Sequence, residues 1–166
     1  MDTNEGPPTI RKPAEIAREL FVKGITWWNQ KKVEKALRCF QRAHELNPED
    51  PIIASYLGLV LVDSGIFNRG FELCRGALRE NPSNADLLFN LGQAYLMSSR
   101  RNEARLTFLR GAKTCEDQHR FLDVLIKMGV RRKPTIRLLS RDHPFNRWLG
   151  KLTYRPETVR IEDITN

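Results

Sequence analysis

The stretch LFNLGQAY (residues 88–95) occurs twice more in altered form, as ASYLGLVL (54–61) and LFVKGITW (20–27), and the copies are spaced 34 residues apart. The apolar residues around the glycines of these copies recur at helical spacing. A fixed period over most of a chain indicates stacked copies of one small supersecondary unit. The sequence therefore predicts an all-α solenoid, and the repeated positions, being apolar or small, argue against an enzyme.

The period extends beyond this stretch. Ala36, Gly70 and Ala104 follow the three glycines by twelve residues, Phe40, Cys74 and Phe108 follow them by sixteen, and Pro48 and Pro82 close the first two units. The pattern resembles the tetratricopeptide repeat family, in which a large apolar residue, leucine-glycine, an aromatic residue, alanine, an aromatic residue and proline recur. The resemblance covers about residues 17–118. It implies a right-handed solenoid of three helix-turn-helix repeats that binds other proteins.

Helix boundaries are predicted by local signals. Pro13 suits a first helical turn, Asp50 is a candidate N-cap, and Ser83 with Asp86 resembles a capping arrangement. Gly129 is expected to end the last helix. We expect helices over 13–28, 32–46, 51–64, 67–80, 85–98 and 101–114, with a capping helix over 117–128.

The chain divides into three regions by composition. Residues 1–12 are expected to be a flexible lead, residues 13–129 the solenoid with its capping helix, and residues 130–166 a basic tail. The tail should contain a short amphipathic helix beginning near Pro144. Residues 1–118 carry a net charge of +2 and residues 119–166 a net charge of +6, so the basic excess is concentrated at the C-terminal end.

The resemblance implies that the first helices of successive repeats line a concave groove. A second apolar stripe on each of these helices supplies the expected groove residues, which are Phe21, Ile25, Trp28, Tyr56, Leu59, Val62, Phe89, Gln93 and Leu96. Such a groove suits an amphipathic helix or an extended peptide with hydrophobic anchors. The alternative is that the chain's own termini fill it.

One variant of the family binds the acidic C-termini of heat-shock chaperones and needs lysine, asparagine and arginine on its groove helices. The corresponding positions here hold Phe21, Ile25, Tyr56, Asp86 and Asn90. This departs from the variant's pattern, so we do not expect that ligand class. The three-repeat chaperones of bacterial type III secretion translocators, which have a similar length, are another comparison.

The basic tail has several interpretations. Its expected anion-binding residues are Arg131, Arg132, Lys133, Arg137, Arg141, Arg147 and Lys151. They could neutralise the phosphates of nucleic acid, with Phe145 and Trp148 interleaved for stacking. They could instead attract an anionic membrane, dock on a protein partner or on the solenoid, or be solvated.

Other function classes find little support in the sequence. His44, His119 and His143 lack metal-ligand spacing, the three cysteines do not form a disulfide framework, and no glycine-rich phosphate loop occurs. We therefore expect a non-catalytic adaptor or scaffold without a cofactor. Residues 1–13 contain no apolar signal-peptide core, which leads us to expect a cytoplasmic protein.

The three-region division generates a first prediction. Truncation after Gly129 should leave a folded, helical protein, because the apolar period ends near Met128 and the basic excess begins beyond it. Thermal unfolding followed by circular dichroism checks this. Loss of cooperative unfolding in the truncated chain would mean that the tail belongs to the core.

Overall fold

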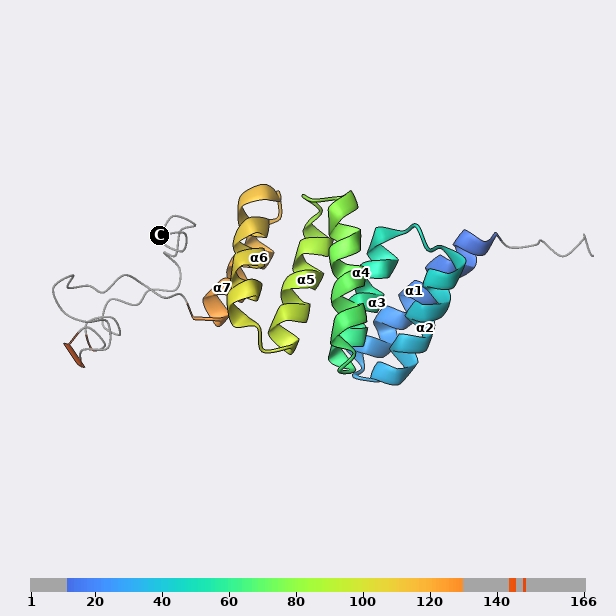
Figure 1. The fold of residues 1–166 in the computed structure, drawn as a ribbon, viewed down its shortest axis with the longest axis horizontal. Coiled ribbons are helices and arrows are strands. Elements are labelled where there is room, and N and C mark those ends of the chain that lie inside the picture. The colour runs from blue at the N-terminus through green and yellow to red at the C-terminus, as the bar shows by residue number, and fades with distance from the viewer. Residues whose placement is uncertain (1–11, 130–143, 146–147, 149–166) are drawn as a thin grey trace, which may run out of the picture.

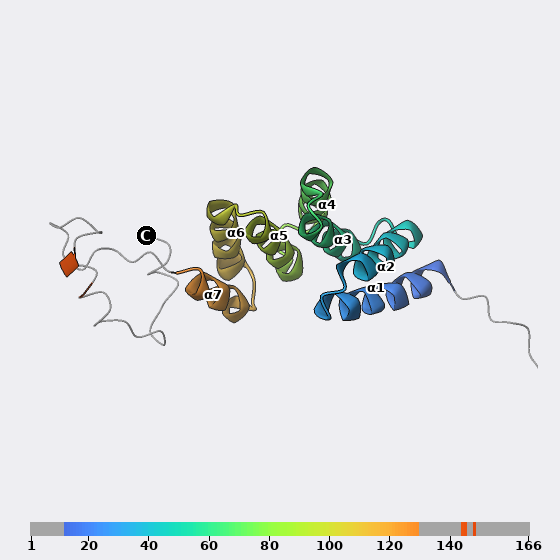
Figure 2. The same ribbon diagram turned by 90° about the horizontal axis from the view of Figure 1, so that it is seen from below.

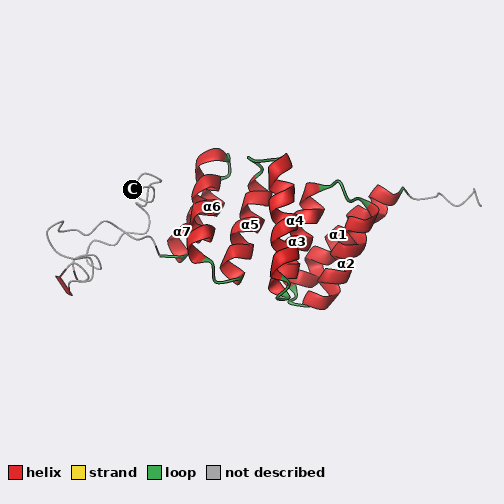
Figure 3. Ribbon diagram, viewed as in Figure 1, coloured by secondary structure: helices red, strands yellow, loops and turns green. Residues whose placement is uncertain are grey.

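The structure is a computed structural model that describes residues 12–129, 144–145 and 148. The part of the chain it describes contains seven helices and no strand (Figures 1 and 3). The helices are α1 (Pro13–Asn29), α2 (Val33–Leu46), α3 (Pro51–Asp63), α4 (Phe67–Glu80), α5 (Ala85–Met97), α6 (Arg101–Thr114) and α7 (Gln118–Lys127).

Consecutive helices pair as antiparallel hairpins, and the hairpins stack. Helix α1 packs against α2, α3 against α4 and α5 against α6, while α3 also contacts α5 and α7 packs against α6. Figure 2 shows an arc in which α1, α3, α5 and α7 follow the inner side and α4 and α6 lie on the outer side. This confirms the predicted fold class. None of the described helices is long and apolar enough to cross a membrane.

Local signals set most helix ends as predicted. The Asp50 side chain accepts hydrogen bonds from the backbone N–H groups of the second and third residues of α3, at 2.9 and 3.2 Å. The capping prediction at Ser83 was wrong by one residue, since the Asn84 side chain makes the equivalent bonds at the start of α5. Gly65 and Gly129, with φ values of +84° and +81°, follow α3 and α7 in a left-handed conformation that glycine adopts without strain.

The repeated glycines mark where the two helices of a hairpin meet. In the first repeat, a Cβ atom on Gly24 would lie 2.7 Å from Cε1 of Phe40, so the glycine makes room for the ring. Gly92 faces Phe108 in the same way in the third repeat. Both phenylalanine side chains are completely buried. Burial of such a side chain contributes on the order of 1.5–3 kcal/mol, which depends here on the missing Cβ.

In the second repeat, smaller residues form the contact between the two helices of the hairpin. Cys74 occupies the phenylalanine position, and Gly70 occupies the alanine position. A Cβ atom on Gly58 would lie 2.6 Å from the carbonyl oxygen of Gly70 and 2.7 Å from Sγ of Cys74. The two helices therefore approach backbone to backbone, where nothing flexible could move aside.

Helix α7 covers the end of the stack as predicted. Phe121 is completely buried, and its ring lies over Gly111 of α6. It also joins the rings of Phe89 and Phe108, with centroid distances of 5.8 and 6.4 Å. At the end of α7, Nη2 of Arg101 donates a hydrogen bond of 2.9 Å to the carbonyl of Met128. The cap thus extends the same glycine-over-phenylalanine contact by one helix.

This contact geometry predicts opposite effects for two glycines of one hairpin. Gly58→Leu should destabilise the fold by roughly 1–3 kcal/mol or more, because the side chain would overpack the α3–α4 contact. Gly76→Ala on α4 is the matched control, since its Cβ would approach no closer than 3.8 Å to Arg79. This control should be neutral or stabilising by up to about 1 kcal/mol through helix propensity. Thermal melts that place both variants at the same midpoint would contradict the assigned contact.

The packing of Cys74 generates a third prediction. Its thiol is fully buried against the carbonyl of Ser55, at 3.4 Å, and burial raises its pKa to about 12. The thiolate is the reactive form, so Cys74 should resist maleimide in the folded protein while the half-buried Cys39 reacts first. Mass spectrometry of labelled peptides measures both rates. Equal labelling rates for Cys74 and Cys39 in the native protein would show that α3 and α4 separate readily.

Candidate functional site

Most of the predicted groove residues lie on α1, α3 and α5, the helices that follow the inner side of the arc, and are partly exposed. Seven of the nine are half-buried, which leaves part of each side chain accessible; they are Phe21, Ile25, Trp28, Tyr56, Phe89, Gln93 and Leu96. Leu59 and Val62 differ, since they are 1% and 2% exposed. These two residues belong to the core beneath the surface, and the expectation that they contact a partner is corrected.

The burial of Leu59 and Val62 follows from the central place of α3. This helix contacts α2 on one side and α5 on the other, in addition to its own partner α4. Leu59 and Val62 share a core cluster with Leu88 and Leu91 of α5. On α3, the second apolar stripe therefore serves packing against the neighbouring repeat.

Aromatic rings join α1 to α3 along the concave surface. Phe21 and Trp28 both meet Tyr56 edge to face, at centroid distances of 5.1 and 6.3 Å and interplanar angles of 87°. Nε1 of Trp28 lies 3.4 Å from a carboxylate oxygen of Asp63, at the end of α3. These contacts fix the rings and leave a half-exposed aromatic row across the first two repeats.

The adjacent tryptophans of α1 have different surroundings. The ammonium groups of Lys32 and Lys35 both lie 4.8 Å from the Trp27 ring, beside α2. Both rings pack against the core cluster of α1–α3 residues, and Trp28 also packs against the cluster dominated by α5 and α6 residues. The two rings thus lie in different surroundings, and Trp28 contributes to both core clusters. Its removal would affect stability as well as any binding.

A charged pair lies at the other end of the concave surface. Nη1 of Arg120, on α7, lies 2.6 Å from Oδ1 of Asp86 on α5, and the Arg120 guanidinium stacks 3.7 Å from the centroid of Phe89. Burial raises the pKa of Tyr56, the negative charge of Asp86 raises it further, and Arg120 opposes that rise. The three groups thus share one electrostatic environment across α3, α5 and α7.

A polar contact lies beneath the surface between α3 and α5. Nδ2 of Asn90 donates a hydrogen bond of 3.1 Å to Oγ of Ser55, and both residues are at most 2% exposed. A buried amide paired in this way is satisfied within the fold. Asn90 is therefore not available to a ligand.

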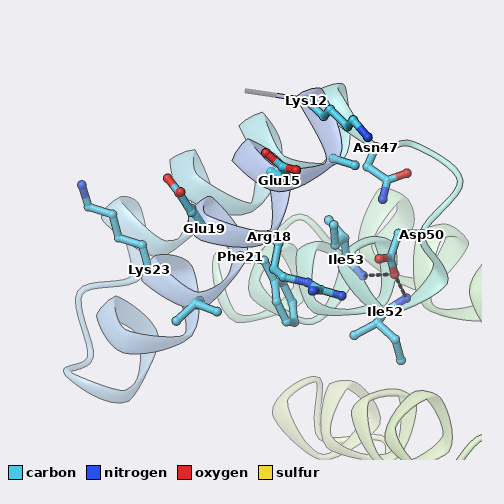
Figure 4. A pocket seen from close by; sticks show the side chains of 12 residues that line it. Lys12, Glu15, Arg18, Glu19, Phe21, Lys23, Asn47, Asp50, Ile52 and Ile53 are labelled. Carbon is cyan, nitrogen blue, oxygen red and sulfur yellow. Dashed lines mark hydrogen bonds between the residues drawn. The ribbon is translucent and has the colours of Figure 1, made fainter. Parts of the chain in front are cut away.

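A pocket of about 1140 Å³ opens between the beginnings of α1 and α3 (Figure 4). Its apolar lining includes Phe21, Val22, Ile52 and Ile53. Figure 4 shows the Arg18 side chain pointing from α1 towards α3 within this lining. Pockets for small molecules usually measure about 300–1000 Å³, so this space is large enough for side chains of a bound polypeptide.

The predicted groove set did not include Arg18, Asp63, Asp86 or Arg120. The repeat period itself could have indicated the last two as neighbours, because Arg120 follows Asp86 by 34 residues. The pairs Trp28–Asp63 and Ser55–Asn90 are each 35 apart. Side chains on neighbouring first helices therefore meet at one repeat length or one residue more.

The seven predicted anion-binding residues of the tail, from Arg131 to Lys151, lie outside the described residues. Of the predicted tail helix, the structure describes Pro144, Phe145 and Trp148, and the two aromatic residues give its contacts. Their side chains are 49% and 56% exposed, and their ring centroids lie 5.8 Å apart. The interpretations of the tail stay predictions.

Comparisons with known proteins agree with this architecture. The family model of the tetratricopeptide repeat matches residues 17–50. No curated protein sequence matches the chain. The first TPR of Spaghetti (RPAP3), solved bound to the HSP90 peptide SRMEEVD, is 19% identical with a TM-score of 0.57, over 69% of this chain and 91% of that one.

Two further solved structures are similar. The TPR domain of Arabidopsis OM64 is 20% identical with a TM-score of 0.57, over 69% of this chain and 94% of that one. The first TPR domain of human RPAP3, solved by NMR, is 17% identical with a TM-score of 0.59, over 86% of this chain and 99% of that one. The chain thus contains a tetratricopeptide repeat at residues 17–50 and has the fold of tetratricopeptide repeat domains, which confirms the resemblance.

Proposed function

We propose that this protein is a non-catalytic adaptor that binds a segment of a partner protein on its concave surface. The partner segment is an amphipathic helix or an extended peptide with hydrophobic anchors. The observation that carries the proposal is the row of half-buried apolar side chains on α1, α3 and α5, continued by the pocket at the α1–α3 end. Concave surfaces with aromatic residues at their centre are typical of peptide recognition.

The proposed ligand differs from the acidic peptide bound to Spaghetti. Of the two polar groups at the positions compared above, the carboxylate of Asp86 pairs with Arg120, and the amide of Asn90 bonds to Ser55. Phe21, Ile25 and Tyr56 fill the other positions. An apolar face of the partner fits these side chains better than a cluster of carboxylates, because none of these five positions offers a cation to a carboxylate that loses its hydration.

The test uses a surface substitution that the fold should tolerate. Val22 lines the pocket and is 57% exposed, so Val22→Asp places a charge in the proposed site without burying it. Leu106→Asp is the matched control, because Leu106 is 63% exposed on α6, outside the concave surface. Peptides are first selected from a displayed random library on the full chain. Their affinities for each variant are then measured by fluorescence polarisation.

Val22→Asp should weaken the selected peptides by about tenfold, which corresponds to about 1.4 kcal/mol. Leu106→Asp should leave the affinity unchanged. Affinity should also vary little with salt, because apolar burial is not screened as phosphate contacts are. Equal weakening by both variants, or a steep loss of affinity with salt, would count against the groove and in favour of a charged surface.

A further inference from the structure

Two arginine side chains lie over one stacked pair of aromatic rings between the second and third repeats. The rings of Phe71 and Tyr95 stack with centroids 5.0 Å apart and planes inclined by 29°, and the residues are only 6% and 8% exposed. The guanidinium carbon of Arg75 lies 5.5 Å from the Phe71 centroid, and that of Arg100 lies 5.1 Å from the Tyr95 centroid. Each guanidinium carbon also lies within about 6 Å of the other ring, at 5.9 Å from the Tyr95 centroid for Arg75 and 5.3 Å from the Phe71 centroid for Arg100, so both cations contact this ring pair, which forms the aromatic floor of the cluster.

This cluster is separate from the concave surface. Phe71 and Arg75 belong to α4, which lies on the side of the arc away from α1 and α7 (Figure 2). Arg100 lies in the turn before α6. The cluster therefore takes no part in the proposed groove, and its function can be tested independently.

Hydrogen bonds orient the two guanidinium groups differently. Nε and Nη2 of Arg75 donate to the hydroxyl oxygen of Tyr95, at 3.3 and 3.1 Å. The hydroxyl proton of Tyr95 is donated to no acceptor within residues 12–129. Nε and Nη2 of Arg100 both lie 2.7 Å from Oε1 of Glu103. Each arginine is thus held by one edge, and its remaining N–H groups are available to a ligand.

The local charge is unbalanced. A bond from its own backbone N–H and one from Arg100 lower the pKa of Glu103, and the positive charge of Arg75 contributes to the same shift. Arg75 is therefore close enough to Glu103 to affect it, although its hydrogen bonds go to a neutral phenol. Within residues 12–129, the Glu103 carboxylate is the one acid hydrogen-bonded to either guanidinium, and it pairs with Arg100, which leaves an excess positive charge beside the ring pair.

We propose that Arg75, Arg100 and Tyr95 form a binding site for a phosphate dianion. The free N–H groups of the two arginines and the phenol proton supply donors for its terminal oxygens. Arginine suits this ligand because its planar fork pairs with phosphate oxygens, and the aromatic floor reduces the freedom that binding would remove. The dianion is either the phosphomonoester of a phosphorylated protein side chain or free inorganic phosphate.

The experiment titrates the full chain by calorimetry with a phosphoserine peptide, its unphosphorylated form and inorganic phosphate. Arg75→Gln and Arg100→Gln should each weaken phosphoserine binding by about tenfold or more, because each removes a charge-assisted fork. Arg79→Gln is the matched control, since Arg79 lies one turn further along α4 and the charge change is identical. Circular dichroism melts verify folding. If Arg75→Gln fails to fold, Arg75→Lys, which keeps the charge but loses the fork, takes its place.

The two sources of the ligand give different results. Tighter binding of the phosphoserine peptide than of inorganic phosphate supports a phosphorylated protein, and equal binding supports free phosphate. Three results would overturn the proposal: no saturable binding at millimolar phosphoserine peptide, equal binding of the unphosphorylated peptide, or equal weakening by Arg79→Gln. Equal weakening by Arg79→Gln would show that the basic surface attracts anions without a defined site.

Discussion

The close contact between the two helices of each hairpin is the constraint on which the rest of the structure depends. A glycine on the first helix admits a phenylalanine ring of the second at Gly24 and Gly92, and the helix backbone itself at Gly58. The cap repeats the contact between Gly111 and Phe121. Because each hairpin closes in this way, its remaining apolar surface is left to pack against the next hairpin, and the stack grows by addition of similar units.

Stacking also determines what the inner surface can offer. The first helices lie side by side, so side chains one repeat length apart meet, and the Asp86–Arg120 and Ser55–Asn90 pairs use polar groups within the fold. The side chains that remain half-exposed on the inner surface are mainly aromatic and aliphatic. The apolar character of the surface therefore comes from the internal pairing of its polar residues as well as from its composition.

The helices could be predicted closely from sequence, because proline, glycine and N-cap residues mark their ends and the period identifies equivalent positions. The environment of a side chain was harder to predict. Periodicity shows that Leu59 and Val62 share a face, but not that α5 covers that face. The capping residue at Asn84 and the arginines over Phe71 and Tyr95 depend on local geometry and on contacts between repeats, which a pattern within one repeat does not specify.

The central functional claim is that a partner segment lies on the concave surface. Methyl NMR of the full chain, titrated with a library-selected peptide, tests this claim residue by residue. The account predicts chemical-shift changes at Ile25, Ile52 and Leu96, which are half-buried on the first helices, and none at the exposed Ile66 and Leu106. Changes confined to Ile66 and Leu106 would place the partner elsewhere and contradict the account.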